Sequence, residues 1–337
     1  KRQAMSARHW IVTVVVLAAL GTLPWWAGDQ YQLHLASLIG VYWILIAGLN
    51  LVVGYTGQLS IGHVGLLAIG AYAFSILAGR HEWNPYIAML TSGGIGAFCG
   101  LLLGLPSLRL PGFYFAMATL AFSLIVTEIS LAQGELTGGG AGLPVPGFPA
   151  PFDSPGGFYS LVLVVALLVT WLTWNVARYT WGRALVAVRD SVVTAQAVGV
   201  PVFRAKLMVF VFSGMTAGVA GALFASLQSY ITPDTFVFEL GLFFFVCIII
   251  GGRGTIVGPL LGTAILTALP EVVAPLARWS TFFYGLLLLV VVLLVPEGIG
   301  RVVEVVRNRL RPKREQSITI QPDPERLARA LRSSDRP

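Results

Sequence analysis

Apolar runs long enough to cross a lipid bilayer recur along this chain of 337 residues. The clearest three are 11–27, 34–53 and 158–176. A helix rises ~1.5 Å per residue, so about 20 apolar residues cross the ~30 Å of hydrocarbon in a membrane. Charged residues make up 11% of the chain, against about 25% in an ordinary soluble domain. The sequence therefore predicts an all-α polytopic membrane protein that lies in contact with membrane lipid.

About ten transmembrane helices fit the hydropathy pattern. We expect a short N-terminal segment at 1–9, a transmembrane domain at 10–299 that contains a polar loop at 178–206, and a basic tail at 300–337. One span is too short for a full crossing and ends in a glycine cluster, so it is either a complete span or a broken, re-entrant helix. The predicted spans are 10–27, 34–53, 61–79, 85–105, 113–132, 158–177, 207–229, 238–251 (the short one), 256–273 and 280–296.

The basic residues gather in three places, although the net charge is only +7. They precede the first apolar run, occupy the loop at 178–206, and fill the tail from Arg301 to Arg336. By contrast, the charged residues of segment 134–157 are both acidic, Glu135 and Asp153. This asymmetry follows the positive-inside rule and predicts that both termini, the 178–206 loop and the tail are cytoplasmic. No small-residue cleavage site follows the first run, so no cleavable signal peptide is expected. Nucleic acid is not expected as a partner.

A glycine-rich, polar stretch at 54–73 reads GYTGQLSIGHVGLLAIGAYA and interrupts the apolar pattern. Irregular backbone at membrane depth is tolerated where protein or a water-filled cavity satisfies its polar groups, and such interruptions mark permeation sites. The alternative is close helix packing, which small residues also permit. A second interruption, GGRGTIVGPLLG, lies at 251–262, as in transporters built from internal repeats. The predicted pathway residues are Gly57, Gln58, Ser60, Gly62 and His63.

The loop at 178–206 carries apolar residues at helical spacing, which predicts one short amphipathic helix. Gly199 followed by Pro201 should end it. Such a helix either rests on lipid headgroups or docks a cytoplasmic partner. The apolar residues are Leu185, Val188, Val192, Ala195 and Val198.

The motifs of common catalytic sites are missing from the chain. None of its lysines stands in a GxxxxGK[ST] phosphate-binding loop, and neither HExxH nor GxSxG occurs. Cys99 and Cys247 lie in apolar surroundings, so neither a disulfide framework nor a metal site is expected.

Glu128 is the acidic residue that lies well inside a predicted span, where it either snorkels and pairs locally or serves a function. His63 is likewise either a packed, hydrogen-bonded histidine or a donor in a pathway. We predict no catalytic residues and no metal ligands, and a secondary transporter or channel is the alternative of another class.

Five blocks of the chain resemble the permeases of branched-chain amino acid ABC importers, the LivM-like group. The resemblance covers about 48–298, in the order that the family has. The blocks read GLNLVVGYTGQLSIGHVGLLAIGAYA, GFYFAMATLAFSLIV, ELTGGGAGLP, WGRALVAVRDSVVTAQAVGVPVFRAKLMVFVFSG and IIIGGRGTIVGPLLGTAIL.

The resemblance implies an ABC importer permease fold in the bacterial inner (plasma) membrane. It implies three kinds of partner: a LivH-like second permease, two ABC ATPase subunits, and a periplasmic or lipoprotein substrate-binding protein. ATP would be used by the ATPase subunits, so this chain would bind no cofactor and would not itself be an enzyme. The implied substrates are leucine, isoleucine and valine, and relatives that import urea or short amides leave that alternative open.

In the family, the cytoplasmic loop couples the permease to the ATPase. Gln196 stands here where the family often has glutamate, so the charges that would meet the ATPase are not fixed by the resemblance. The implied coupling residues are Leu185, Val188, Arg189, Asp190, Val192, Ala195 and Gly199, with the apolar members filling a groove on the ATPase and the two charged ones at its rim.

Overall fold

The structure is a computed structural model that describes residues 29–106, 110, 112–273 and 285. The N-terminal segment at 1–9, the first predicted span at 10–27 and the tail at 300–337 lie outside the described residues. So does the last predicted span at 280–296, apart from Gly285.

Seven helices in the described part of the chain are long and apolar enough to cross a membrane. The mostly helical, polytopic class is therefore confirmed, whereas the count of about ten spans is not. α12 (Val257–Val273) is apolar but shorter than these seven. The seven are α2 (Gln30–Asn50) continued by the π-helix η1 (Leu51–Tyr55), α3 (His63–Phe74) continued by the π-helix η2 (Ser75–Arg80), α4 (Pro85–Gly104), α5 (Gly112–Ala132), α7 (Pro155–Arg178), α10 (Val202–Gln228), and α11 (Phe238–Gly251) preceded by the 3-10 turn η5 (Pro233–Thr235).

Two of these helices begin with a capping side chain followed by proline. The side chain of Asn84 accepts a hydrogen bond of 3.0 Å from the backbone N–H of Tyr86, and Ser154 accepts one of 3.1 Å from that of Gly157. In both cases a proline occupies the first helical position. An N-cap of this type satisfies a helix N–H that has no partner within the helix. Proline at the first helical position costs no hydrogen bond, because the N–H of that position has no partner within the helix either.

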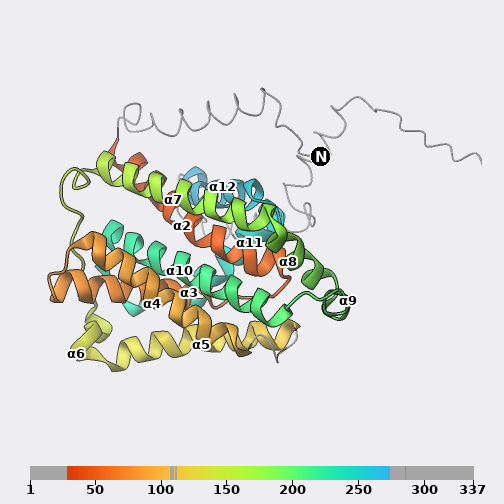
Figure 1. The fold of residues 1–337 in the computed structure, drawn as a ribbon. Coiled ribbons are helices and arrows are strands. Elements are labelled where there is room, and N and C mark those ends of the chain that lie inside the picture. Colours follow the sequence, from red (N-terminus) through yellow and green to blue (C-terminus); the bar gives the residue numbers. More distant parts are fainter. Residues whose placement is uncertain (1–28, 107–109, 111, 274–284, 286–337) are drawn as a thin grey trace, which may run out of the picture. The chain divides into compact units, whose positions relative to one another are not determined.

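Helix α10 lies at the centre of the described bundle, packed against α2, α3 and α4 (Figure 1). Glycines make this packing close. A Cβ placed on Gly96 of α4 would overlap the carbonyl oxygen of Gly214, and one on Gly214 would overlap the carbonyl oxygen of Gly96. Gly70 of α3 meets Gly218 of α10 in the same way. Small residues of this kind let membrane helices approach backbone to backbone.

Helices α5 and α7 are less buried and carry large exposed apolar side chains, among them Phe113 and Trp171. Exposed apolar surface on this scale suits a bilayer or another apolar protein surface. On the connections, β1 (Leu143–Pro144) pairs antiparallel with β2 (Tyr230–Ile231), with Leu143 opposite Ile231. This pairing joins the loop after α5 to the end of α10. Two short elements precede β1 in that loop, α6 (Gly134–Thr137) and the 3-10 turn η4 (Gly139–Ala141).

The predicted single helix in the 178–206 loop is wrong. The structure has two helices, α8 (Thr180–Asp190) and α9 (Val192–Ala197), separated by an extended Ser191. The Ser191 hydroxyl accepts a hydrogen bond of 3.2 Å from the N–H of Thr194, so this residue starts a new helix as its N-cap. The predicted stop is confirmed, because α9 ends at Ala197 and Gly199 has φ +81°.

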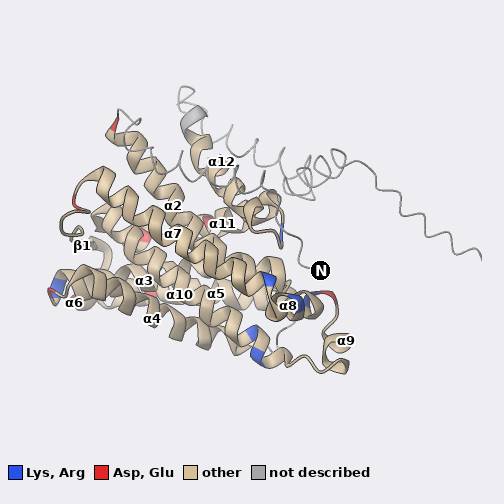
Figure 2. Cartoon of the chain, turned by 45° about the horizontal axis from the view of Figure 1, so that its top comes forward, with Lys and Arg blue, Asp and Glu red and all other residues tan. Residues whose placement is uncertain are grey.

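Basic side chains gather at the end of the bundle that carries α8 (Figure 2). Arg80, which ends η2, is the exception among the described lysines and arginines, and it donates to the backbone carbonyl of Glu135. The basic residues at the α8 end are Arg178, Arg183, Arg189, Arg204, Lys206 and Arg253.

Candidate functional site

The first glycine-rich interruption is the connection between two candidate spans. The helix formed by α2 and η1 ends at Tyr55, residues 56–62 are not helical, and α3 begins at His63. Gly57 lies in this segment with φ +71°, a backbone conformation that favours glycine. Residues 56–62 are called the first break below.

His63 is fully buried and both of its ring nitrogens have partners. Nδ1 lies 2.7 Å from the hydroxyl of Ser60, and Nε2 lies 2.8 Å from the hydroxyl of Ser213 on α10. All three side chains have no exposed surface. The imidazole therefore joins the first break to the central helix, as the packed alternative requires.

Gly62 makes a close backbone contact with α5. A Cβ there would overlap the carbonyl oxygen of Thr119. The hydroxyl of Thr119 accepts hydrogen bonds from the backbone N–H groups of Ile61 (3.2 Å) and Gly62 (3.3 Å), and it donates to the carbonyl of Ala116 (2.9 Å). One threonine thus satisfies two backbone donors that no helix supplies with a partner.

Of the five residues predicted to line a pathway, Gly57 is exposed and the other four are buried. Close packing is thus observed directly at Gly62 and His63. A role in permeation stays a prediction for all five residues.

The second interruption contacts the helix that leads into the first. Helix α11 ends at Gly251 and α12 begins at Val257, so residues 252–256 form the second break. The side chain of Asn50 donates to the carbonyl of Thr255 (2.7 Å) and accepts from the N–H of Gly254 (3.3 Å). Asn50 is buried at the end of α2. Sequence reasoning missed it, although a single amide at the end of a long apolar run was a usable signal.

Arg189 of α8 lies against both breaks. Its Nη1 donates to the carbonyl oxygen of Gly54 (3.0 Å), and its Nε lies 3.3 Å from a carboxylate oxygen of Asp190. A Cβ on Gly57 would lie 2.8 Å from Cγ of Arg189, and one on Gly254 would lie 3.0 Å from Nη1. The guanidinium of Arg189 thus binds this chain's own backbone, and its predicted place at the rim of a partner's groove stays a prediction.

Of the apolar coupling residues, Leu185, Val188 and Ala195 are buried, whereas Val192 is exposed. Leu185 is 1% exposed and Val188 is 2% exposed. Leu185 belongs to the main core, while Val188 and Ala195 pack with Val202 at the start of α10. These side chains hold α8 and α9 on their own chain and cannot also fill a groove on a partner. An amphipathic stripe indicates burial without saying which surface buries it.

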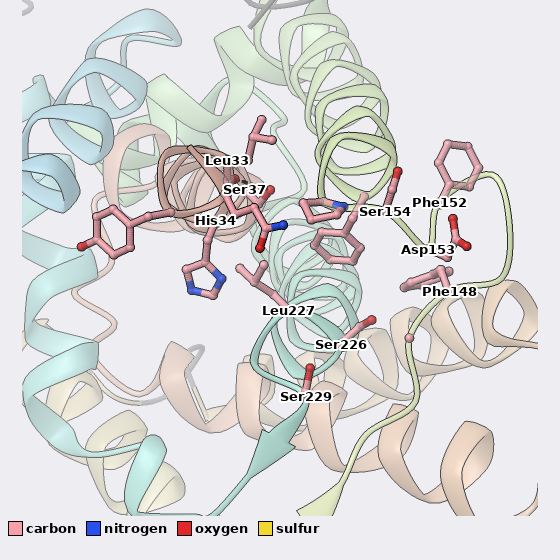
Figure 3. A pocket seen from close by; sticks show the side chains of 15 residues that line it. Leu33, His34, Ser37, Phe148, Phe152, Asp153, Ser154, Ser226, Leu227 and Ser229 are labelled. Carbon is pink, nitrogen blue, oxygen red and sulfur yellow. Dashed lines mark hydrogen bonds between the residues drawn. The ribbon is translucent and has the colours of Figure 1, made fainter. Parts of the chain in front are cut away.

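A cavity of about 460 Å³ opens at the other end of the bundle, where α2 and α7 begin and α10 ends (Figure 3). Its wall combines aromatic rings, such as Phe148 and Phe158, with serine hydroxyls and the side chains of His34 and Asp153. Within the described ranges, no group of three His, Cys, Asp or Glu side chains could hold a metal ion.

Helices of membrane-spanning length, backbone-to-backbone glycine packing and two glycine-rich breaks together define a polytopic membrane transport protein. The comparisons with known proteins define the family. Residues 31–294 match the family described as the permease component of branched-chain amino acid transport systems, and the chain belongs to this family. It is thus a permease component of an ABC-type import system and not itself an enzyme.

Several curated proteins are similar to this chain. The high-affinity branched-chain amino acid transport system permease protein LivM of Escherichia coli (strain K12) is 32% identical over 88% of this chain and 75% of its own length. LivM of Salmonella typhimurium is 30% identical over 80% of this chain and 69% of its own length. The fructose import permease protein FrcC of Rhizobium meliloti is 24% identical over 84% of this chain and 82% of its own length. No solved structure matches.

Proposed function

We propose that this chain is the permease for leucine, isoleucine and valine in an ATP-driven importer. The observation that carries the proposal is the identity of 32% with a branched-chain amino acid permease over 88% of this chain. The composition of the first break is compatible with this substrate. No formal charge stands between Asp29 and Arg80, so no fixed charge on that stretch would trap the zwitterionic head of an amino acid.

The family also contains permeases for other substrates, so the substrate needs its own test. The autoinducer 2 import permease LsrC of an Enterobacter species is 29% identical over 68% of this chain, and FrcC is named for fructose. Both are less similar to this chain than the LivM proteins are. Urea and short amides stay as the alternative within the same architecture.

The proposed assembly contains a LivH-like second permease, two ABC ATPase subunits and a substrate-binding protein. The substrate would pass between the two permeases, and the ATPase subunits would bind the ATP. The basic residues at the α8 end support an orientation in which α8, α9 and both termini are cytoplasmic. The cavity lined by His34 and Asp153 would then open on the outer side.

The surface that would meet the ATPase is α9 rather than the buried stripe of α8. Val193 is 77% exposed and Val198 is 72% exposed, and Val192 beside them is also exposed. Exposed apolar residues on a short helix that is held firmly by its own buried side are suitable anchors for a partner's groove. Gly199, with its positive φ, ends this surface.

The proposed pathway passes the first break. Gly57 is exposed there, while Ser60 and His63 would become accessible only when the break moves away from α10. Transport would then require the hydrogen bond between His63 and Ser213 to open during the cycle. Gln58 and Gly62 would follow the same movement.

Uptake in cells tests the proposal. The chain and its three kinds of partner would be expressed in a bacterial strain that lacks its own branched-chain amino acid importers. Radiolabelled leucine should accumulate, and unlabelled isoleucine or valine should compete with it, whereas urea and fructose should not. Accumulation of urea without leucine would indicate a urea or short-amide importer of the same architecture. Uptake by this chain without its ATPase partners would indicate a secondary transporter.

A further inference from the structure

We propose that Arg189 is the positioning residue that transmits movement of α8 and α9 to both glycine-rich breaks. The inference rests on the proposed function as an ATP-driven importer. It assigns to this arginine a task inside the permease, whereas the resemblance implied only a contact with the ATPase.

The contacts of Arg189 place it across the two breaks. Its guanidinium donates to Gly54, the residue two positions before the first break, and its aliphatic stem lies over Gly57 within that break. The same Nη1 lies beside Gly254 of the second break. One side chain of α8 thus touches the backbone of two segments that are about 200 positions apart in the sequence.

The positive charge of Arg189 is favourable at its position beside the carboxyl end of the helix formed by α2 and η1. The last carbonyl groups of a helix carry partial negative charge, and a cation near them is stabilising. Gly54 belongs to η1, at the carboxyl end of the helix that α2 begins. The interaction is a charge-assisted hydrogen bond, which is stronger than one between neutral groups. Arg189 therefore binds the end of this helix more firmly than a neutral side chain would.

The second break is also tied to the helix end that leads into the first break. The buried Asn50 bonds to Gly254 and Thr255, and a Cβ on Gly54 would overlap the backbone nitrogen of Gly254. Since the first break joins α2 to α3 and the second joins α11 to α12, a displacement of Arg189 acts on four helices at once. Gly57 and Gly254 both have positive φ, so neither break is held by regular helix geometry at this point.

The packing of the rest of α8 would let this helix transmit a movement of α9 to Arg189. Leu185 packs in the main core, and Val188 packs with Ala195 of α9 and Val202 of α10, so α8 and α9 are packed against each other. Arg189 is one residue beyond this buried stripe, and α9 follows after Ser191. A push on α9 would therefore reach the breaks through Arg189.

Thiol labelling in the assembled transporter tests the inference. Cys99 and Cys247 are first replaced by alanine, and single cysteines are introduced as Leu59→Cys in the first break and Thr255→Cys in the second. Both positions are half-buried. The labelling rate with a water-soluble maleimide is measured in proteoliposomes with and without ATP, first with Arg189 intact and then with Arg189→Gln. Arg183→Gln, which removes the same charge from an exposed position of the same helix, is the matched control.

With Arg189 intact, ATP should change the labelling rate at both positions. Arg189→Gln should reduce that ATP-dependent change at least about tenfold, which is an ordinary size for coupling between sites. ATP hydrolysis and assembly should persist, and Arg183→Gln should behave like the reference. A purely structural role would instead lower assembly, hydrolysis and labelling together. An unchanged response in Arg189→Gln would overturn the inference, as would breaks that do not respond to ATP in a reference transporter that still imports leucine.

If the transporter with Arg189→Gln does not assemble, the transporter with Arg189→Lys tests the inference instead. Lysine retains a positive charge near the helix end, so the ATP-dependent change should stay within about twofold of the reference. Loss of the change in an assembled Arg189→Lys transporter would contradict the proposed role of the charge. A reference transporter that imports no leucine at all would count against the proposed function, whatever the labelling shows.

Discussion

The imidazole of His63 lies between two helices, with its Nε2 2.8 Å from the hydroxyl of Ser213 on α10. Its other nitrogen lies 2.7 Å from the hydroxyl of Ser60, in the first break. The polar group that stood out in the sequence is therefore held inside the protein. A transport cycle that uses the first break has to open this contact.

Removing the imidazole should destabilise the protein. His63→Ala leaves two buried hydroxyls without their partner, at a cost of about 1–3 kcal/mol each. Ser213→Ala should cost less, since it leaves a single ring nitrogen unsatisfied. The melting temperature of the detergent-solubilised protein measures both effects. Thr91→Ala is the control, because the half-buried Thr91 donates to the carbonyl of Ile87 within its own helix. Equal melting temperatures for His63→Ala and the control would contradict this account.

Two glycines of α4 should respond oppositely to alanine. A Cβ on Gly96 would overlap the carbonyl of Gly214, whereas a Cβ on Gly94 would meet no atom within 4 Å. Gly96→Ala should cost about 1–3 kcal/mol through overpacking. Gly94→Ala should be neutral or stabilise the helix by up to about 1 kcal/mol. Thermal unfolding of the pair checks this, and a destabilised Gly94→Ala would mean that the open space is occupied.

The contact with the ATPase should depend on α9 and not on the buried face of α8. Val193→Asp changes an exposed residue, so the permease should fold normally while its affinity for the ATPase and its uptake both fall. Val188→Asp buries an unpaired charge and should lower the amount of folded permease. Size-exclusion chromatography separates these two defects. Normal uptake by a folded Val193→Asp transporter would show that α9 is not part of the surface that contacts the ATPase.

Accessibility of the first break should depend on the transport cycle. Ser60→Cys, in a background free of Cys99 and Cys247, should be protected from a water-soluble thiol reagent at rest because Ser60 has no exposed surface. It should react during ATP hydrolysis if the break opens. Protection in both states would mean that the first break serves packing alone.

Sequence patterns predicted the described spans well, because each needs only a local run of apolar residues. The start of α10 was placed five residues late, since Arg204 and Lys206 look like loop residues, yet Val202 and Ala205 are buried on the same turn. The helix break at Ser191 had a usable signal, because serine is a preferred N-cap residue. Apolar spacing that continued across it outweighed that signal.

The contacts of the candidate site could not be predicted in the same way. Arg189 and Asn50 both bind backbone atoms of segments remote in the sequence, and such contacts leave no trace in residue spacing. The stripe of Leu185 and Val188 correctly indicated burial. Whether the burying surface belongs to the same chain or to a partner depends on tertiary packing, which periodicity does not contain.

Leucine accumulation by the purified, reconstituted assembly tests the central claim most directly. Proteoliposomes that contain this permease, its proposed second permease and the ATPase subunits would receive the binding protein and radiolabelled leucine outside and ATP inside. The account predicts ATP-dependent accumulation against a gradient, and none when the ATPase carries a substitution of its phosphate-binding lysine. Leucine accumulation that is independent of ATP, or ATP-driven accumulation of another substrate in place of leucine, would contradict it.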